Sequence, residues 1–245
     1  MRFGKIFGAL IASPVLFLVG NAVASDINNL KSLNQQQFKD FSRDITSALS
    51  YKAVEPATNL GITGFDASLG VSVVRMKNSN VWQQATGTDV GFLPIPKLQI
   101  SKGLPFGIDI SGFYTAVPTT NIHLYGAALK YSLLEGTAVP PALAIRGTYT
   151  KLDGVDQLGF DSKGLELLVS KGFLGITPYA GVGVVNSNST AHLPAPFASL
   201  LSSVNQTESK VFAGINWNIL LGNLALEYDR TGNNDTLSAK IGIRW

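Results

Sequence analysis

Apolar residues recur at every second position over most of the chain after residue 64. Phe65, Ala67 and Leu69 alternate with polar or small residues at the start of this region, and Ile241 and Ile243 do so at its end. A period of two is typical of β-strands whose two faces meet different surroundings. We therefore predict ten strands, over residues 64–73, 92–103, 105–117, 121–134, 141–152, 162–172, 175–187, 207–220, 222–231 and 237–245.

Residues 26–50 have a longer period. Their apolar positions are Ile27, Leu30, Leu33, Phe38, Phe41, Ile45 and Leu49. This spacing predicts an amphipathic helix, with Asp26 as its N-cap. Pro56 and Gly61 cannot continue a helix, so residues 53–63 are predicted to be a linker. The expected organisation is a helical segment at 25–52, this linker, and a β-domain at 64–245.

Residues 1–24 have the features of a secretory signal peptide. Arg2 and Lys5 precede a mostly apolar stretch at 6–20, and Ala22 and Ala24 provide a small-residue cleavage signal. The alternative is a membrane anchor, but about 15 apolar residues are too few to span a bilayer comfortably. We expect cleavage before Ser25.

The composition indicates a membrane β-barrel. Charged residues make up 14% of the chain and hydrophobic residues 45%, whereas soluble domains carry about 25% charged residues. The alternative is a soluble barrel or sandwich, which would turn the face that carries Lys240 and Arg244 outward; a membrane barrel turns it inward. The net charge of +3 has no basic cluster with it, so no nucleic-acid partner is expected, and the absence of cysteine excludes a disulfide.

The connections favour an up-and-down barrel. The odd-numbered ones are mostly longer and polar, as at 78–91 and 188–206, and the even-numbered ones are tight. In membrane barrels the longer loops face the cell surface and the short turns face the periplasm. An even number of strands brings both ends of the β-domain to the same side.

The last strand resembles the C-terminal strand of Gram-negative outer-membrane β-barrels, because Trp245 ends the chain behind Ile243 and Ile241. This resemblance implies the outer membrane as location, outer-membrane lipid as surroundings, and periplasmic chaperones and the barrel assembly machinery as partners. Residues 49–66, which include Leu60-Gly61-Ile62-Thr63-Gly64-Phe65-Asp66, also resemble a group of uncharacterised outer-membrane proteins, which implies no activity. A helix ahead of the first strand is similar in outline to the long-chain fatty-acid transporters, but those barrels are larger and their binding residues do not transfer.

The inward-facing positions of such a barrel collect charged residues. The candidate ion-pair residues are Arg146, Glu166, Glu227, Asp229, Lys240 and Arg244. A hairpin with Asn233 and Asn234 at its tip would place Glu227 directly opposite Lys240, and Arg146 lies near Glu166 across the 153–161 loop. These residues form either an ion-paired network that closes the lumen or a selectivity filter.

Two further segments are candidates for function. The helix either caps or plugs the barrel from the periplasmic side through Phe38, Phe41, Ile45 and Leu49, or it lies on the membrane with its aromatic residues in the interface. The longest loop contains His192, Phe197, Leu200 and Leu201, which form either a binding surface for a small hydrophobic ligand or partner, or a lid over the barrel mouth.

Catalytic and metal-binding signals are weak. The two histidines, His123 and His192, have no nucleophile or carboxylate at a recognisable spacing. No cysteine or cluster of histidines and carboxylates has metal-ligand spacing, so no metal or cofactor is expected. The leading hypothesis is a small gated channel or transporter for a small or hydrophobic solute. The alternatives are a non-transporting structural or surface-interaction barrel with a closed lumen, and an outer-membrane lipid-modifying enzyme.

Overall fold

The computed structural model describes residues 27–116, 122–136 and 140–245. The expected signal peptide, its cleavage position, the expected N-cap Asp26 and the connection at 118–120 lie outside these residues.

Ten strands run through the described residues, and their inward positions are buried and often polar while their outward positions are mostly exposed and apolar. The strands are β1 (Phe65–Arg75), β2 (Phe92–Leu104), β3 (Ile108–Ala116), β4 (His123–Leu134), β5 (Ala142–Asp153), β6 (Leu158–Ser170), β7 (Ile176–Ala191), β8 (Val204–Ile219), β9 (Gly222–Thr231) and β10 (Asn234–Arg244).

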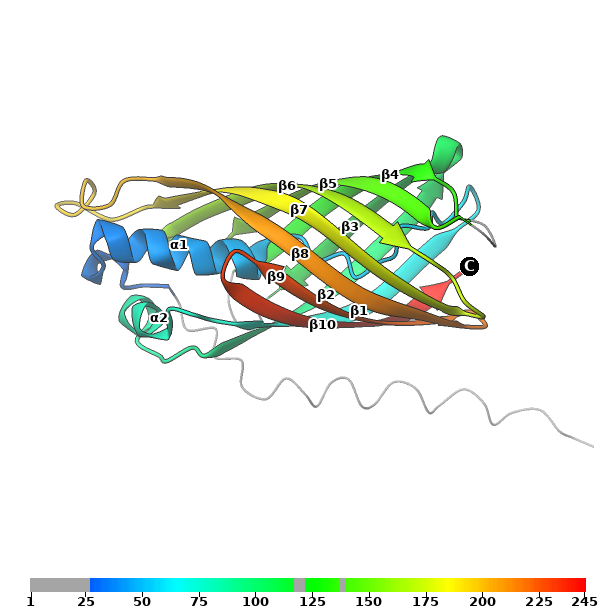
Figure 1. Ribbon diagram of the computed structural model, residues 1–245. Helices are drawn as coiled ribbons and strands as arrows, with labels where there is room; N and C mark the ends of the chain where they lie inside the picture. Colours follow the sequence, from blue (N-terminus) through cyan, green and yellow to red (C-terminus); the bar gives the residue numbers. More distant parts are fainter. Residues whose placement is uncertain (1–26, 117–121, 137–139) are drawn as a thin grey trace, which may run out of the picture.

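The strands close into one antiparallel barrel (Figure 1). Each strand pairs with its neighbours in the chain, and β1 pairs with β10 to complete the ring, with Leu69 opposite Ile241. The predicted ten-stranded up-and-down barrel is therefore confirmed. Closure leaves no free sheet edge, which a lipid environment requires because no water is present there to satisfy backbone groups.

Some strand boundaries differ from the predicted ones. β6 begins at Leu158, β7 continues to Ala191 and β8 begins at Val204, so these strands are longer than expected at one end of the barrel. Their extra residues are polar on the outer side, and a polar pair such as Asn188 and Asn205 lacks the apolar alternation from which strands are recognised. β3 begins late, because Pro105–Gly107 forms a short 3₁₀ turn (η2).

The outer face of the barrel is a belt of exposed apolar side chains. Leu69 and Ile243, for example, are 51% and 54% exposed, and Trp245 stacks beside Phe65 with ring centroids 4.9 Å apart. Apolar area on this scale is stable only against lipid or another apolar surface, so the barrel spans a membrane. Within the described ranges, the helices are too short or too polar to cross a bilayer by themselves.

The helical part differs from the prediction. Instead of one helix at 26–50, a 3₁₀ turn (η1, Leu30–Ser32) precedes α1 (Gln35–Leu49). Asn34 begins α1 as a capping box: its side chain accepts from the Gln37 backbone N–H, and its own N–H donates to the Gln37 side chain, both at 2.9 Å. This cap starts a new helix at Gln35, so the apolar residues before it do not extend the helix. A second helix, α2 (Ser79–Thr86), lies in the connection between β1 and β2.

The helix α1 lies at one end of the barrel, and its apolar face is buried there (Figure 1). We call the end where β1 begins and β10 ends the base, and the opposite end, with the longer connections, the loop end. Figure 1 shows α1 at the loop end, beside α2 and opposite the C-terminus, where it contacts α2 and β7–β10. The chain then runs through the interior to the base. Residues 27–64, the lumenal segment, therefore traverse the barrel from its loop end.

Candidate functional site

The lumenal segment meets wall residues that lie progressively closer to the base. Near its start, Gln35 exchanges hydrogen bonds with Ser202 in the loop between β7 and β8. Further along, the Tyr51 hydroxyl is 2.9 Å from Ser111, and the Leu60 N–H donates to the carboxylate of Asp109 at the base. The segment is thus bonded to the wall along the length of the lumen.

Apolar packing seals the loop end. Phe38, Phe41 and Ile45 of α1 are fully buried, and Leu49 packs against the same cluster. The Phe41 ring lies 4.7 Å from the ring of Trp82 in α2. This places the four helix residues named from the sequence on one face, directed into the barrel mouth and not toward a membrane surface.

Asp44 joins three elements at this end. Its carboxylate accepts hydrogen bonds from the Asn78 backbone N–H, the Asn78 side chain, the Trp82 indole and the Asn234 side chain, at 3.0–3.1 Å. These donors come from the start of α2 and from the turn between β9 and β10. Burial raises the pKa of Asp44, and the hydrogen bonds from Asn234, Asn78 and Trp82 offset part of that rise.

Below the helix the interior is charged and balanced. The described residues bury six basic side chains here, Lys52, Lys97, Lys130, Arg146, Lys210 and Lys240. They bury six acidic ones at the same depth, Glu55, Asp66, Asp109, Glu166, Glu227 and Asp229. Balance of this kind is what makes burial of so many charges tolerable, because each ion needs an opposite charge to offset its desolvation.

Five of these residues form an upper network. Lys52 of the lumenal segment lies 3.0 Å from Asp229, and Asp229 lies 3.4 Å from Lys210. Lys210 then contacts Glu166 at 2.7 Å, and Glu166 accepts from Arg146 at 2.7 Å. The network thus connects the lumenal segment to β9, β8, β6 and β5 through side chains alone.

A lower network lies nearer the base. Glu55 of the lumenal segment is 3.7 Å from Lys240, which is 3.6 Å from Asp66, and Asp66 pairs with Arg244 at 2.8 Å. Glu55 also accepts from Ser101 at 2.7 Å. Each network therefore contains one charge from the lumenal segment, and removing the segment would leave Asp229 and Lys240 each with one partner fewer.

Much of the rest of the wall is lined by small hydroxyl side chains. These buried residues are Ser68, Ser72, Ser101, Thr150, Ser162, Ser170, Ser187, Ser189, Thr236 and Ser238. Small side chains leave the central space to the lumenal segment, which a ten-stranded barrel could otherwise fill from its own wall. Below α1 the wall that the segment covers is therefore mostly polar, and an apolar cluster of Ala142, Ala144, Leu168, Tyr179 and Phe212 packs against Ala57.

The last hairpin has a different register from the predicted one. Gly232 and Asn233 form its tip, and Gly232 takes a positive φ of 57°, which glycine adopts without steric cost. The prediction placed Asn233 and Asn234 there, so Glu227 lies opposite Ser238 and not opposite Lys240. Both side chains still face inward, but Glu227 accepts from the Tyr179 hydroxyl at 2.9 Å.

Other ion-pair candidates do meet. Arg146 lies directly opposite Glu166 in the β5–β6 register, as expected from the sequence. Asp229 and Arg244 take part in the two networks. Sequence reasoning missed Lys97 and Lys130, although both stand at inward positions of a period-two pattern. It also missed Lys52 and Glu55, for which the linker offers no periodic signal.

The apolar loop after β7 is divided between core and surface. Leu201 is buried against the cluster around α1, whereas Phe197 and Leu200 are exposed. His192 lines a shallow surface hollow with Asp156 and neighbouring residues. One half of the loop thus acts as part of the seal at the loop end.

The described residues give little support for catalysis. The Tyr114 hydroxyl lies 2.7 Å from His123 Nδ1, and the two rings stack. Within the described ranges, neither His123 nor His192 is hydrogen-bonded to a serine or a carboxylate. In the same part of the chain, no three His, Cys, Asp or Glu side chains converge in a way that could hold a metal ion.

Several solved barrels are similar in outline. The N-terminal β-barrel domain of OprF from Pseudomonas aeruginosa matches with a TM-score of 0.36 and 12% identity, over 76% of this chain and 99% of that one. The outer membrane protein Omp33 of Acinetobacter baumannii matches at 0.33 and 8%, over 77% and 100%. The attachment invasion locus protein Ail of Yersinia pestis, bound to the heparin analogue sucrose octasulfate, matches at 0.32 and 11%, over 74% and 99%. Likenesses this low carry no functional information.

No curated protein matches the sequence. One family model does, and it is described as a family of unknown function (DUF6588). The match covers residues 15–245 and so includes both the lumenal segment and all ten strands. The chain therefore belongs to the DUF6588 family.

Proposed function

We propose that this protein is a gated channel for small hydrophilic solutes in the outer membrane of a Gram-negative bacterium, and that the lumenal segment is its gate. The observation that carries the proposal is the contrast between the polar, charged wall and the single chain segment that fills it. A barrel whose lumen is permanently closed could be filled by an apolar core. This wall would still be wetted by water if the segment moved.

The charges favour a hydrophilic solute over a hydrophobic one. Lys210, Glu166 and Arg146 stay on the wall when the segment moves, since β8, β6 and β5 carry them. An apolar solute would have to pass these desolvated ions, whereas a hydrated solute would replace the contacts that Lys52 and Glu55 provide. We therefore propose a small hydrophilic solute, and not the hydrophobic solute that the sequence also allowed.

The proposed orientation follows from the loops and from the last strand. The base would face the periplasm and the loop end the cell surface, as in other barrels with long outer loops. A signal peptide would export the chain, and the assembly machinery would read the strand that ends at Trp245, with Ile243 and Ile241 facing lipid. The gate would then be sealed from the outer side, by α1.

An engineered disulfide tests the gate. The Thr46 and Ser187 side-chain oxygens are 2.6 Å apart and join α1 to β7, so Thr46→Cys with Ser187→Cys can form a bond in a chain that has no other cysteine. A disulfide would tie α1 to β7 covalently, so oxidation should lower the open fraction in planar bilayers at least about tenfold, which is about 1.4 kcal/mol. Reduction should restore it.

Two further pairs make the test specific. Ser72 and Ser238 lie 2.8 Å apart on the wall itself, so a disulfide between cysteines at these positions should leave conductance unchanged. Thr58 and Ser170, 3.1 Å apart near the base, provide a second lock that should act like the first. Lys52→Ala, which loses the contact with Asp229, should increase opening. If wild type, reduced locks and Lys52→Ala all insert but never conduct, the barrel is a closed surface protein and the channel proposal is wrong.

A further inference from the structure

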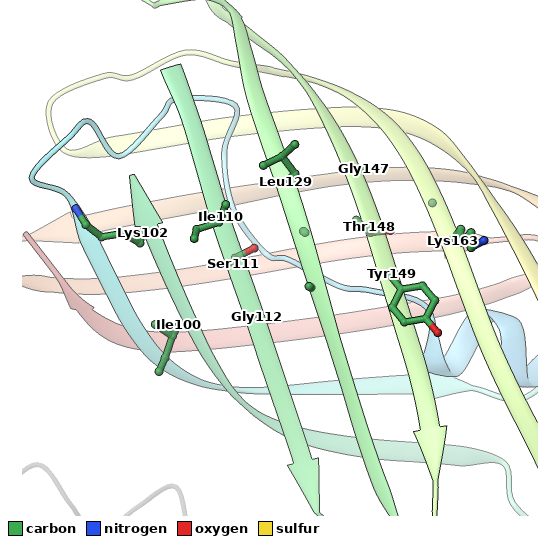
Figure 2. Close-up of a pocket in the computed structure, with 13 residues that line it drawn as sticks. Ile100, Lys102, Ile110, Ser111, Gly112, Leu129, Gly147, Thr148, Tyr149 and Lys163 are labelled. Carbon is green, nitrogen blue, oxygen red and sulfur yellow. The ribbon is translucent and has the colours of Figure 1, made fainter. Parts of the chain in front are cut away.

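We propose that the outer wall over β2–β6 holds one phosphate-bearing anionic lipid, with an acyl chain in a groove and the phosphate on Lys163. The inference rests on the proposed membrane location, but it concerns the outer surface and is independent of the gate. The groove has a volume of about 790 Å³ and crosses five strands. Figure 2 shows Lys102 at one end of it and Lys163, beside Tyr149, at the other.

The groove exists because large outward side chains are missing from its floor. Gly112 on β3 is paired with Ala127 on β4. On the neighbouring strand β5, the outward-facing Gly147 lies opposite Leu129 of β4. Ile110 and Leu129 stand beside this floor as exposed apolar walls. A straight hydrocarbon chain fits such a channel, and its affinity comes from close van der Waals packing, since lipid offers no hydrophobic driving force.

The fold itself does not require these glycines. Neither Gly112 nor Gly147 has a positive φ. A Cβ added to Gly147 would meet nothing within 4 Å, and one added to Gly112 would make only an ordinary contact at 3.5 Å. Glycine weakens a strand interior and often marks a place where another molecule approaches the backbone closely. The inferred reason for glycine here is the bound chain.

Lys163 supplies the charge that selects the lipid. It faces outward at the upper limit of the apolar belt, between Leu165 toward the base and Asp161 toward the loop end, opposite Asn186. Among the described residues no carboxylate lies within salt-bridge distance of its ammonium, whereas Lys151 nearby pairs with Asp153 at 3.3 Å. Lipid phosphates lie at this level of a bilayer and attract basic side chains.

Lys102 at the other end is already engaged. Its ammonium donates to the backbone carbonyls of Ile62 at 2.6 Å and Gly64 at 3.1 Å. The free cation of the groove within the described residues is therefore Lys163, which fixes the direction of the lipid: headgroup toward the loop end, acyl chain toward the base.

Native mass spectrometry of the refolded full chain tests the site. Detergent micelles would contain equal amounts of phosphatidylglycerol and phosphatidylcholine. The wild-type protein should retain one phosphatidylglycerol molecule more often than one phosphatidylcholine molecule. Lys163→Gln removes a charge-assisted contact and should lower this preference about tenfold. Gly147→Leu fills the floor from a Cβ that would meet nothing within 4 Å, and it should lower retention of both lipids. The matched controls are Ala213→Leu, on the outer face of β8, and Arg230→Gln, at an exposed cation of β9; both should behave as wild type.

The possible outcomes separate this inference from the proposed function. Equal retention by wild type, Gly147→Leu and Lys163→Gln would overturn the lipid site, even if the protein inserts and conducts as proposed. A change of oligomeric state in Gly147→Leu, without loss of lipid, would also overturn it, because a second copy would then occupy the groove. A chain that folds but does not insert into vesicles would contradict the proposed function, and the lipid site would fail with it because it rests on the membrane location.

Discussion

Replacing Glu166 with alanine is expected to lower the free energy of unfolding by about 3–5 kcal/mol, as when one partner of a buried ion pair is removed. Glu166 accepts from Arg146 and lies 2.7 Å from Lys210, and all three side chains are at most 2% exposed. Without this carboxylate, no carboxylate of the described residues lies within salt-bridge distance of Arg146, and among them Lys210 keeps Asp229 alone. Urea unfolding in detergent micelles, followed by tryptophan fluorescence, measures the loss.

A surface ion pair provides the control for this prediction. Lys151 and Asp153 are 3.3 Å apart on the outer side of β5, and each side chain is nearly half exposed. Lys151→Ala should therefore have a negligible effect, because exposed pairs are screened by solvent. If Glu166→Ala unfolds at the same urea concentration as Lys151→Ala, the upper network does not hold the lumen together.

Replacing Asp44 with alanine is expected to release α1 from the mouth of the barrel. Four hydrogen-bond donors of Asn78, Trp82 and Asn234 would lose their common acceptor. A buried donor that is left without an acceptor costs about 1–3 kcal/mol, so a total loss of at least about 3 kcal/mol is a low estimate when water replaces some of the lost bonds. Hydrogen exchange of residues 35–49 should speed up by about 100-fold.

The neighbouring carboxylate on the same helix is a matched control. Asp40 lies 3.5 Å from Arg43, and its side chain is partly exposed. Asp40→Ala should leave both exchange and bilayer conductance unchanged, while Asp44→Ala should increase both. Similar exchange rates in the two variants would show that the apolar packing of Phe38 and Phe41 is sufficient to hold the helix.

The effect of Asp44→Ala should depend on pH. Burial raises the pKa of Asp44 from its ordinary value of 3.8. A carboxyl whose pKa is higher in the docked state favours docking most at low pH, and this contribution is lost as the pH rises through the raised pKa. The difference in helix docking between wild type and Asp44→Ala should therefore be largest in acid and smaller at neutral pH.

The barrel could be predicted from the sequence because its pattern is local. Each strand alternates along its own length, as Leu237, Ala239 and Ile241 do with Ser238 and Lys240, and low overall charge decides which face meets lipid. Pairing of Arg146 with Glu166 followed from the same rule. The inward direction of Lys97 and Lys130 could also have been predicted from the sequence, because each lies between outward apolar residues of a strand.

Other features depend on contacts that no local pattern contains. The register of the last hairpin depends on which two residues form its tip. A tip of Gly232 and Asn233 and a tip of Asn233 and Asn234 are both compatible with the sequence. The roles of Lys52 and Glu55 follow from the path of an irregular segment, which is fixed by distant partners such as Asp229 and Lys240. Nor does the amphipathic pattern of α1 say at which end of the barrel its apolar face is buried.

The threading of residues 27–64 through the ring of strands restricts the order of biogenesis. β1 and β10, the first and last of the ten strands in the chain order, form the seam that closes the ring. A segment that had to enter afterwards would draw the charged side chains of Lys52 and Glu55 through a narrow pore lined by buried ions. The simpler route has the strands wrap around the segment while the seam is open. Residues 27–64 then lie inside the ring as it closes, and Lys52 and Glu55 meet Asp229 and Lys240 as the strands assemble.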